Sequence, residues 1–472
     1  MKKLYGIAAL ASVLLASGCA VQEPDVSVFS QSLADETWSH EPQGAVAVWP
    51  ESVEFWGAFG DGVLTTLVSK ACESSSDVKA AVAGVRAARA LVTGTTAALW
   101  PTGTVSVGGQ QTDVRHDGDR IWSAGGQLQY SLNLAGREYR LDEAAQLDAA
   151  ASLLTLEDVR AVVAADTAQS YFNYRWARLQ TALLQEAASN YRETADLAGW
   201  RYEAGLGSAS DAEDALTQWS NARAQLADAQ RNAQTYVNAL ARLTLMKRSA
   251  VQALLDSGEQ ALPALPSAVV ASVPADALRR RPDVRSAELS LRAAAYRIAA
   301  SKAAFFPSLT LTGDLGLQTA GLSALGGASA VASIAGTLGA TIMNWGALQS
   351  QSEQQKAEFD RLEADYTAIV SKALEAADNA ATALRQAEEK KTWVENATRH
   401  AAAAAQLSGL EYETGNGDYQ QLLSTQRTLL STRQSALQNQ VDALNACVVL
   451  YRALGGGWTT ATQATLDDKE GN

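Results

Sequence analysis

"YETGNGD", from Tyr412 to Asp418, decides the fold of this 472-residue chain, because it interrupts a long alanine-rich segment of helical composition. Almost the same string, "YEAGLGS", stands 210 residues earlier, from Tyr202 to Ser208. Gly205 and Gly415 can take the left-handed backbone conformation that ends a helix. Each string therefore predicts the end of one helix and the start of another.

Residues on the far side of both strings suit the start of the returning helix. Ser208 and Asp418 are of the types that cap helix N-termini, and Asp211 and Gln421 follow three residues later as reciprocal partners. We expect one tight turn at 203–210 and a second at 413–420.

A very long helical segment precedes each string. The stretches 137–202 and 347–412 each contain no proline and one glycine. About 66 residues of helix are roughly 100 Å long at 1.5 Å per residue. The returning segments carry apolar residues in a heptad pattern, which indicates coiled-coil packing. These residues are Ala215, Trp219, Ala222, Leu226, Ala229, Ala233, Tyr236, Leu240 and Leu243 in the first, and Leu423, Leu430, Leu437, Leu444 and Tyr451 in the second. Each string is thus predicted to be the tip of a helical hairpin.

The equivalence of the two halves extends beyond the tips and indicates a tandem duplication. "SSSDVKAAVAGVRAA" (74–88) recurs as "RRPDVRSAELSLRAA" (280–294), and Trp100-Pro101 recurs as Phe306-Pro307. We place the first repeat at 61–246 and the second at 276–457. A proline-rich linker joins them at 247–275, and a C-terminal tail covers 458–472.

Each repeat also contains two segments in which apolar and polar residues alternate. They lie at about 102–112 and 121–134 in the first repeat, and at about 308–319 and 331–344 in the second. Period two predicts strands with one apolar and one polar face. Leu128 and Leu311 belong to the apolar set, Gln129 and Thr310 to the polar set. A half-buried sheet of a soluble protein and a sheet of membrane-crossing strands of 9–11 residues both fit this pattern.

The N-terminus favours the membrane interpretation. Lys2 and Lys3 precede an apolar run that ends in "ASGC" at Cys19, which is the pattern of a bacterial lipoprotein signal over 1–18. We expect Cys19 to become the acylated N-terminus of a lipidated segment, 19–60; an ordinary signal peptide with an incidental cysteine is the alternative. Ala20 stands where an aspartate would favour retention at the inner membrane, so the outer membrane is expected.

Four membrane strands create a closure problem. Every backbone group in lipid must be paired, so an open sheet edge is forbidden. The smallest membrane barrels have eight strands. Several chains must therefore share one barrel, and three chains would supply twelve strands.

Composition argues against other classes of protein. The net charge of −13 is unfavourable for nucleic acid binding. His40, His116 and His400 are isolated, and catalytic or phosphate-binding motifs are missing, so we expect no enzyme, no metal and no cofactor other than the covalent lipid. Cys72 and Cys447 are expected to be small core residues, although a bond between them is possible in the periplasm.

The chain resembles the TolC/OprM-like outer membrane factors, and among them the NodT-type efflux lipoproteins. The resemblance rests on "ASGC", "RRPDVRSAELSLRAA", "FFPSLTLTG", "YETGNGD", "STQRTLLSTRQ" and "LYRALGGGW" together. It implies an α+β membrane protein: a homotrimer with a 12-stranded outer membrane β-barrel continuous with a periplasmic α-helical barrel of coiled-coil hairpins. The family's function is to be the exit duct of tripartite pumps, with a periplasmic adaptor and an inner membrane transporter, here expected to be of the RND type.

The resemblance also assigns residues to a periplasmic gate at the tips. The family's gate positions fall on Ser210, Asp211, Tyr412, Gln421 and Ser424, with Arg427 on the same helix as the last two. Tyr412 and Asp211 are expected to form a hydrogen bond, whereas Gln421 and Ser424 carry no charge. A basic residue common near the second tip is replaced by Gly417. Adaptor contacts are expected at Gly205, Leu206, Gly415 and Asn416.

Two other functions remain open from the sequence. A duct for polypeptides in a type I secretion system would have the same wall as a duct for small molecules. A structural or adaptor lipoprotein would use coiled-coil hairpins to bind a partner, although it would not require four membrane strands.

Overall fold

The computed structural model describes residues 52–114, 117–266, 280–319, 329–340 and 345–456. The expected signal peptide, 1–18, and the expected tail, 458–472, lie outside the described residues. So do residues 19–51 of the expected lipidated segment, which include Cys19, and part of the linker. The chain divides into two compact units. One unit includes Gly84–Leu153 and Ser286–Thr367 and carries the sheet; the other includes Leu154–Arg285 and Ala368–Asn472 and carries the hairpins.

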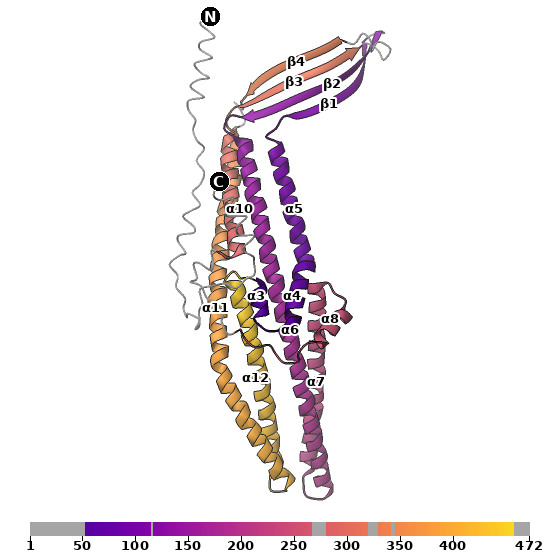
Figure 1. The fold of residues 1–472 in the computed structure, drawn as a ribbon, viewed down its shortest axis with the longest axis vertical. Helices are drawn as coiled ribbons and strands as arrows, with labels where there is room; N and C mark the ends of the chain where they lie inside the picture. Colours follow the sequence, from indigo (N-terminus) through magenta and orange to yellow (C-terminus); the bar gives the residue numbers. More distant parts are fainter. Residues whose placement is uncertain (1–51, 115–116, 267–279, 320–328, 341–344, 457–472) are drawn as a thin grey trace. The chain divides into compact units, whose positions relative to one another are not determined.

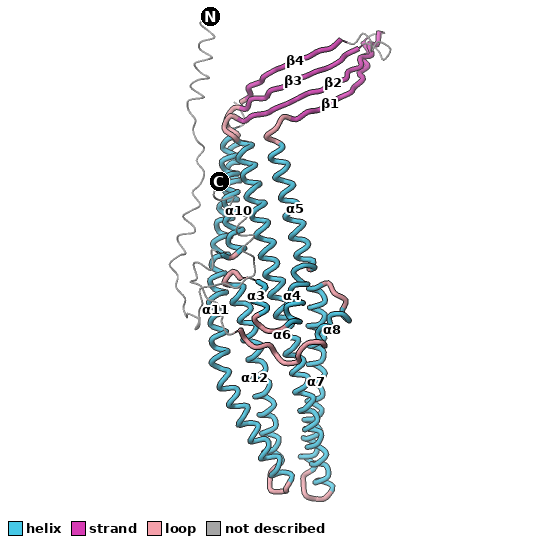
Figure 2. Tube along the Cα trace, in the orientation of Figure 1, coloured by secondary structure: helices cyan, strands magenta, loops and turns pink. Residues whose placement is uncertain are grey.

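Four strands form one antiparallel sheet in the order β1-β2-β3-β4 (Figure 2). Their bounds are Thr102–Val114 for β1, Asp117–Asn133 for β2, Ser308–Thr319 for β3 and Ser329–Gly339 for β4. β1 and β2 extend further towards each other than the alternation predicted, and residues 341–344 of the expected fourth strand lie outside the described part.

The register separates the two faces of the sheet. Leu128 on β2 pairs with Gly313, which pairs with Ile334, so these residues share one face. Leu128 is 61% exposed and Ile334 is 94% exposed, so this apolar face is bare in the single chain.

Polar side chains bond to one another across the opposite face. The row Gln127–Asp314–Ser333 is directly opposed in register. Gln127 Nε2 donates to Asp314 Oδ1 at 2.8 Å, and Ser333 Oγ donates to Asp314 Oδ2 at 3.2 Å. Apolar residues on one face and a hydrogen-bonded polar row on the other fit a sheet between lipid and a wet interior.

Helices α5 (Ser76–Ala97) and α10 (Pro282–Ala303) belong mostly to the sheet unit, with the first turns of α6 and α11. Asp142 on α6 accepts hydrogen bonds from Thr95 Oγ1 at 2.8 Å and Thr96 Oγ1 at 2.7 Å. Gly136 has φ 72°, and this left-handed residue turns the chain from β2 into α6. Hydrogen bonds therefore connect the first turns of α6 to the end of α5.

The other unit is built from two helical hairpins (Figure 1). α6 (Arg137–Glu203) returns as α7 (Ala209–Thr244), and α11 (Trp345–Glu413) returns as α12 (Tyr419–Ala453). On α7 the heptad residues are buried apart from Trp219 and Tyr236, which are half-buried. Short helices complete the described part: α3 (Ser52–Gly57), α4 (Gly62–Ser74) and α8 (Arg248–Asp256), the last within the expected linker.

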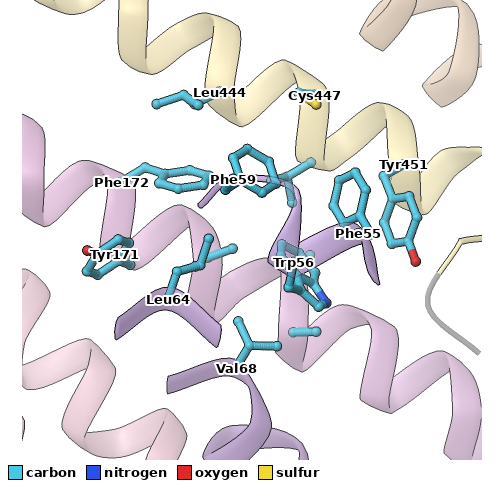
Figure 3. Packing of buried hydrophobic residues seen from close by; sticks show 14 of the residues in the cluster. Phe55, Trp56, Phe59, Leu64, Val68, Tyr171, Phe172, Leu444, Cys447 and Tyr451 are labelled. Carbon is cyan, nitrogen blue, oxygen red and sulfur yellow. The ribbon is translucent and has the colours of Figure 1, made fainter. Parts of the chain in front are cut away.

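An aromatic core joins the short helices to the hairpins (Figure 3). Phe55 on α3 stacks on Tyr451 of α12 with the ring centroids 3.5 Å apart. Cys447 is buried in this core and Cys72 packs against it; both thiols are free. Burial raises the pKa of Cys72 to about 11 and that of Cys447 to about 12, so both stay protonated and act as small core residues.

Among the described helices, none has a stretch long and apolar enough to cross a membrane.

Candidate functional site

The first hairpin tip is a turn between Glu203, the end of α6, and Ala209, the start of α7. Gly205 has φ 72°, the left-handed conformation that the sequence predicted. The amide of Leu206 donates to the carbonyl of Arg201 at 2.7 Å, which closes the turn. Ser208 Oγ accepts from the amide of Asp211 at 3.1 Å, so the expected N-cap is confirmed.

The second tip, between Glu413 and Tyr419, has the same backbone plan. Gly415 has φ 82°, and the amides of Asn416 and Gly417 both donate to the carbonyl of Glu411, at 2.9 and 2.8 Å. Asp418 occupies the N-cap position, but its side chain forms no capping hydrogen bond, so that expectation was wrong. The carboxylate is exposed and stays hydrated, and its charge still favours the helix N-terminus.

Gly417 is where the family pattern would place a basic residue. A Cβ at this position would lie 2.7 Å from the Tyr412 amide nitrogen and 2.8 Å from the Glu411 carbonyl carbon. Both atoms belong to the backbone and cannot move aside cheaply. Any side chain at 417 would therefore force the backbone of this turn to shift.

A residue that the sequence analysis did not single out connects the two tips. Arg201, near the end of α6, places its guanidinium 4.5 Å from the centre of the Tyr412 ring on the second hairpin. Its Nη1 also donates to the Tyr412 carbonyl at 3.0 Å. The signal that could have found it is the position before the tyrosine in each string, which is Arg201 in the first copy and Glu411 in the second.

The expected gate residues all lie at or near the tips, but with different exposure. Tyr412 is buried, Asp211 is half-buried, and Ser210, Gln421 and Ser424 are exposed. The Tyr412 ring lies beside Arg201 and Tyr419, and among the described residues of one protomer Tyr412 has no hydrogen bond to Asp211. The Tyr412–Asp211 link stays a prediction.

Arg427 has a partner on the other hairpin. Its Nε donates to Gln218 Oε1 on α7 at 3.2 Å. Further along the helices, Gln426 Nε2 donates to Thr194 Oγ1 at 3.1 Å, and Arg433 pairs with Glu186 at 2.8 Å. Polar contacts between α12 and the first hairpin thus continue beyond the tips. The exposed Arg433–Glu186 ion pair contributes about 0–1 kcal/mol.

Tyr419 and Tyr412 pack in the small apolar cluster at the tips with Leu422, Leu423 and Ala198. Burial, reinforced by the Asp214 carboxylate, raises the pKa of Tyr419 to about 12. Its hydroxyl is buried and has no hydrogen-bond partner among the described residues.

The chemistry available at the tips is reversible hydrogen bonding and packing. Across the described part of the chain, no three His, Cys, Asp or Glu side chains are placed to hold a metal ion. These contacts join the two hairpin tips and can be broken without breaking a covalent bond.

Comparison with known proteins agrees with this geometry. The family description "Outer membrane efflux protein" matches twice, at residues 67–244 and 273–456, one match in each repeat. The solvent efflux pump outer membrane protein SrpC of Pseudomonas putida is 30% identical over 469 residues, covering 95% of this chain and 98% of SrpC.

One further relative is named for the compound that it exports, and one similar solved structure is of an open channel. The pyoverdine export outer membrane protein OpmQ of Pseudomonas aeruginosa is 28% identical, covering 87% of this chain and 88% of OpmQ. The open state of the Neisseria gonorrhoeae MtrE outer membrane channel superposes with a TM-score of 0.79 at 25% identity, covering 92% of this chain and 97% of MtrE. The expected fold class, that of the trimeric outer membrane channels, is confirmed. This chain belongs to the outer membrane efflux protein family.

Proposed function

We propose that this protein is the outer membrane exit duct of a tripartite efflux pump and passively conducts small molecules to the exterior. The observation that carries the proposal is the pairing, in one chain, of a two-faced four-stranded sheet with two long helical hairpins. A structural lipoprotein would need the hairpins but not a sheet whose bare apolar face includes Leu128 and Ile334. The family to which the chain belongs consists of channel proteins, which supports a transport role over an enzymatic one.

Assembly follows from the sheet. β1 and β4 are its edge strands, and an unpaired edge is not tolerated in lipid. Three protomers joined edge to edge make a closed ring of twelve strands, with Gln127, Asp314 and Ser333 facing the lumen and the leucines facing lipid. Retention of a trimer in SDS without heating, and its loss on boiling, is the expected behaviour of such a barrel.

A matched pair of substitutions tests the orientation of the strands. Leu128→Arg would place a cation in lipid, at a cost of about 2–4 kcal/mol near the midplane, whereas Gln129→Arg would place it in the lumen. We expect Leu128→Arg to abolish outer membrane assembly and Gln129→Arg to leave it intact; Leu311→Arg and Thr310→Arg form a second pair. Equal tolerance of both members would exclude the membrane sheet.

The lipid anchor is part of the proposal. Acylation of Cys19 would attach the N-terminus to the outer membrane, since each buried methylene contributes roughly 0.8 kcal/mol. Cys19→Ser should abolish incorporation of labelled palmitate and reduce the amount of protein in the outer membrane fraction. Undiminished labelling of the variant would exclude Cys19 as the acceptor.

The tips form the periplasmic gate in this proposal. A phenol–carboxylate bond between Tyr412 and Asp211 contributes roughly 1.5–3 kcal/mol when desolvated, and less at a wet mouth. The double variant Tyr412→Phe with Asp211→Ala should raise the conductance of the purified trimer in a planar bilayer and make cells sensitive to vancomycin. An unchanged conductance in a stable trimer would transfer the closing role to Arg427 and Arg201.

Partners and cargo complete the proposal. Gly205, Leu206, Gly415 and Asn416 are exposed turn residues, which supports their assignment as the site where a periplasmic adaptor docks. The inner membrane partner is a transporter of the RND type. The names of SrpC and OpmQ, which specify a solvent and pyoverdine, support small organic molecules as the cargo class.

Gene deletion tests the cargo class directly. The deletion strain should become sensitive to organic solvents, dyes and antibiotics, and the intact gene should restore resistance. Loss of a secreted polypeptide without any change in drug sensitivity would instead favour the type I secretion duct.

A further inference from the structure

One charged side chain lies on the polar face of the sheet, the face that carries the row Gln127–Asp314–Ser333. Asp314 stands near the middle of β3. Among the strand residues whose side chains the structure describes, every other member of this face is neutral. The face therefore has a single fixed charge at a single height.

Two neutral donors hold this carboxylate without neutralising it. Gln127 Nε2 donates to Oδ1 at 2.8 Å from β2, and Ser333 Oγ donates to Oδ2 at 3.2 Å from β4. Each oxygen is thus fixed by one neighbouring strand. No described lysine or arginine forms an ion pair with Asp314, so its negative charge acts on the water beside the sheet.

The charge occurs once in each chain, although the strands occur in both repeats. When Trp100-Pro101 is aligned with Phe306-Pro307, the counterpart of Asp314 is Gly108 on β1. Three chains related by rotation would therefore contribute three carboxylates, all at the same height of one barrel.

We propose that Asp314 is a selectivity-determining residue of the duct, and that its three copies favour the passage of cations over anions. The proposal rests on the proposed function, because it takes the sheet to be one third of a closed barrel. It describes a fixed charge beside a path of moving solutes and not a site that retains an ion. The substrate class that it names is organic cations, with organic anions disfavoured.

The width of the barrel decides whether three charges are enough. Twelve strands spaced about 4.8 Å apart and tilted by about 40° make a backbone wall with a radius of about 12 Å. A carboxylate inside this wall lies within about 10 Å of the axis, which equals the Debye length at 0.1 M salt. The field of each Asp314 therefore reaches the centre of the lumen.

Coulomb's law with this screening gives the size of the effect. Three charges about 10 Å from the axis favour a monovalent cation over a monovalent anion by about fivefold in 0.1 M salt. The Debye length falls to about 3 Å at 1 M, and the preference then falls to about 1.2-fold.

Reversal potentials of the purified trimer in a planar bilayer test the proposal. In a KCl gradient that averages about 0.1 M, Asp314→Asn should lower the ratio of K⁺ to Cl⁻ permeability by about fivefold. Asp314→Glu keeps the charge and should keep the wild-type ratio. Near 1 M KCl, the difference between wild type and Asp314→Asn should almost disappear, because salt screens a charge that no other group neutralises.

Two further variants separate the charge at this position from other effects. Thr310→Asp adds a carboxylate to the same strand and face, so it should raise the permeability ratio by a similar factor even where Asp314→Asn fails to assemble. Asp418→Asn removes one exposed charge per chain from a hairpin tip and should change the ratio less than Asp314→Asn does.

The possible outcomes are distinct. An unchanged ratio in an assembled Asp314→Asn or Thr310→Asp trimer would overturn the proposal, as would a larger effect of Asp418→Asn. A wild-type protein that forms no SDS-resistant trimer, or a trimer that conducts no ions, would overturn the proposed function and this proposal with it.

Discussion

The two hairpin tips share a backbone but not an environment. Both turn at a left-handed glycine. In both, the amide that follows this glycine donates to the carbonyl of the residue before the tyrosine. In the first tip the tyrosine and Leu206 are exposed, at 52% and 75%. In the second tip Tyr412 and Tyr419 are buried, at 5% and 3%.

The difference teaches that a turn motif determines the path of the chain and not the partner of its side chains. The local string is sufficient for the turn, because glycine and the cap residues act within a few positions. Which tyrosine is covered depends on a residue from the other hairpin, Arg201, and on the helix that packs alongside.

Removing the tyrosine from each tip should give the largest difference in local stability between the two tips. Tyr412→Ala deletes a buried ring and its contact with Arg201, so we expect a loss of about 3–5 kcal/mol in the local stability of the second tip. Tyr202→Ala should cost less than about 0.5 kcal/mol in the isolated protomer. Amide hydrogen exchange of peptides that cover each tip measures both values. Similar losses of stability in the two tips would mean that Tyr412 and Tyr202 are not buried to different extents in solution.

Substitution of the last glycine of each turn by alanine should give the next largest difference in stability between the two tips. Gly417→Ala forces its Cβ against the backbone of Tyr412 and Glu411, which costs about 1–3 kcal/mol. Gly207→Ala meets the nearest atom, Arg201 Cβ, at 3.3 Å and should cost clearly less. The same exchange measurement applies, and a tolerated Gly417→Ala would show that the turn can relax.

Removal of the capping residue should separate the tips by a smaller amount. Here the first tip, and not the second, should lose more stability. Ser208→Ala removes a formed cap bond and should destabilise the start of α7 by about 1 kcal/mol. Asp418→Ala removes only a solvated charge near the start of α12, with an effect of about 0.3–1 kcal/mol that salt should screen. Amide hydrogen exchange at low and high ionic strength distinguishes the two variants, because only the effect of Asp418→Ala should weaken with salt.

The smallest effect at neutral pH is expected for Tyr419→Phe. This substitution removes a buried hydroxyl that no described residue bonds, and it should change stability by at most about 1 kcal/mol. At high pH the variant becomes informative. The pKa of Tyr419 is raised to about 12, above the ordinary value near 10. The neutral phenol thus stabilises the folded tip fully below about pH 10, and this contribution is lost as pH rises towards 12, by at most about 1.4 kcal/mol per pH unit.

Thermal melting of the detergent-solubilised trimer, followed by circular dichroism between pH 9 and 12, checks that sign. Wild type should lose stability faster than Tyr419→Phe over this range. Parallel curves would mean that the phenol ionises as freely in the folded tip as in the unfolded chain.

Much of the fold was accessible from the sequence because its signals are local or periodic. The glycines of the two tips, the proline-free helices and the heptads of α7 each act over a few residues or repeat along one element. The alternation of the strands predicted the two faces that the register then paired, with Gln127, Asp314 and Ser333 in one row. The tandem repeat and the family resemblance supplied the order of elements.

What the tertiary structure alone decided is the exact geometry of the second turn and the contacts between distant segments. Whether Asp418 caps its helix and whether Gly417 could carry a side chain depend on that geometry, and whether Cys72 meets Cys447 depends on how distant helices pack. The sequence by itself determined two equivalent hairpins, because glycine conformation and helix periodicity are short-range properties. Only the folded chain made them unequal, because Arg201 and Tyr412 stand 211 positions apart and meet only when the two hairpins pack together.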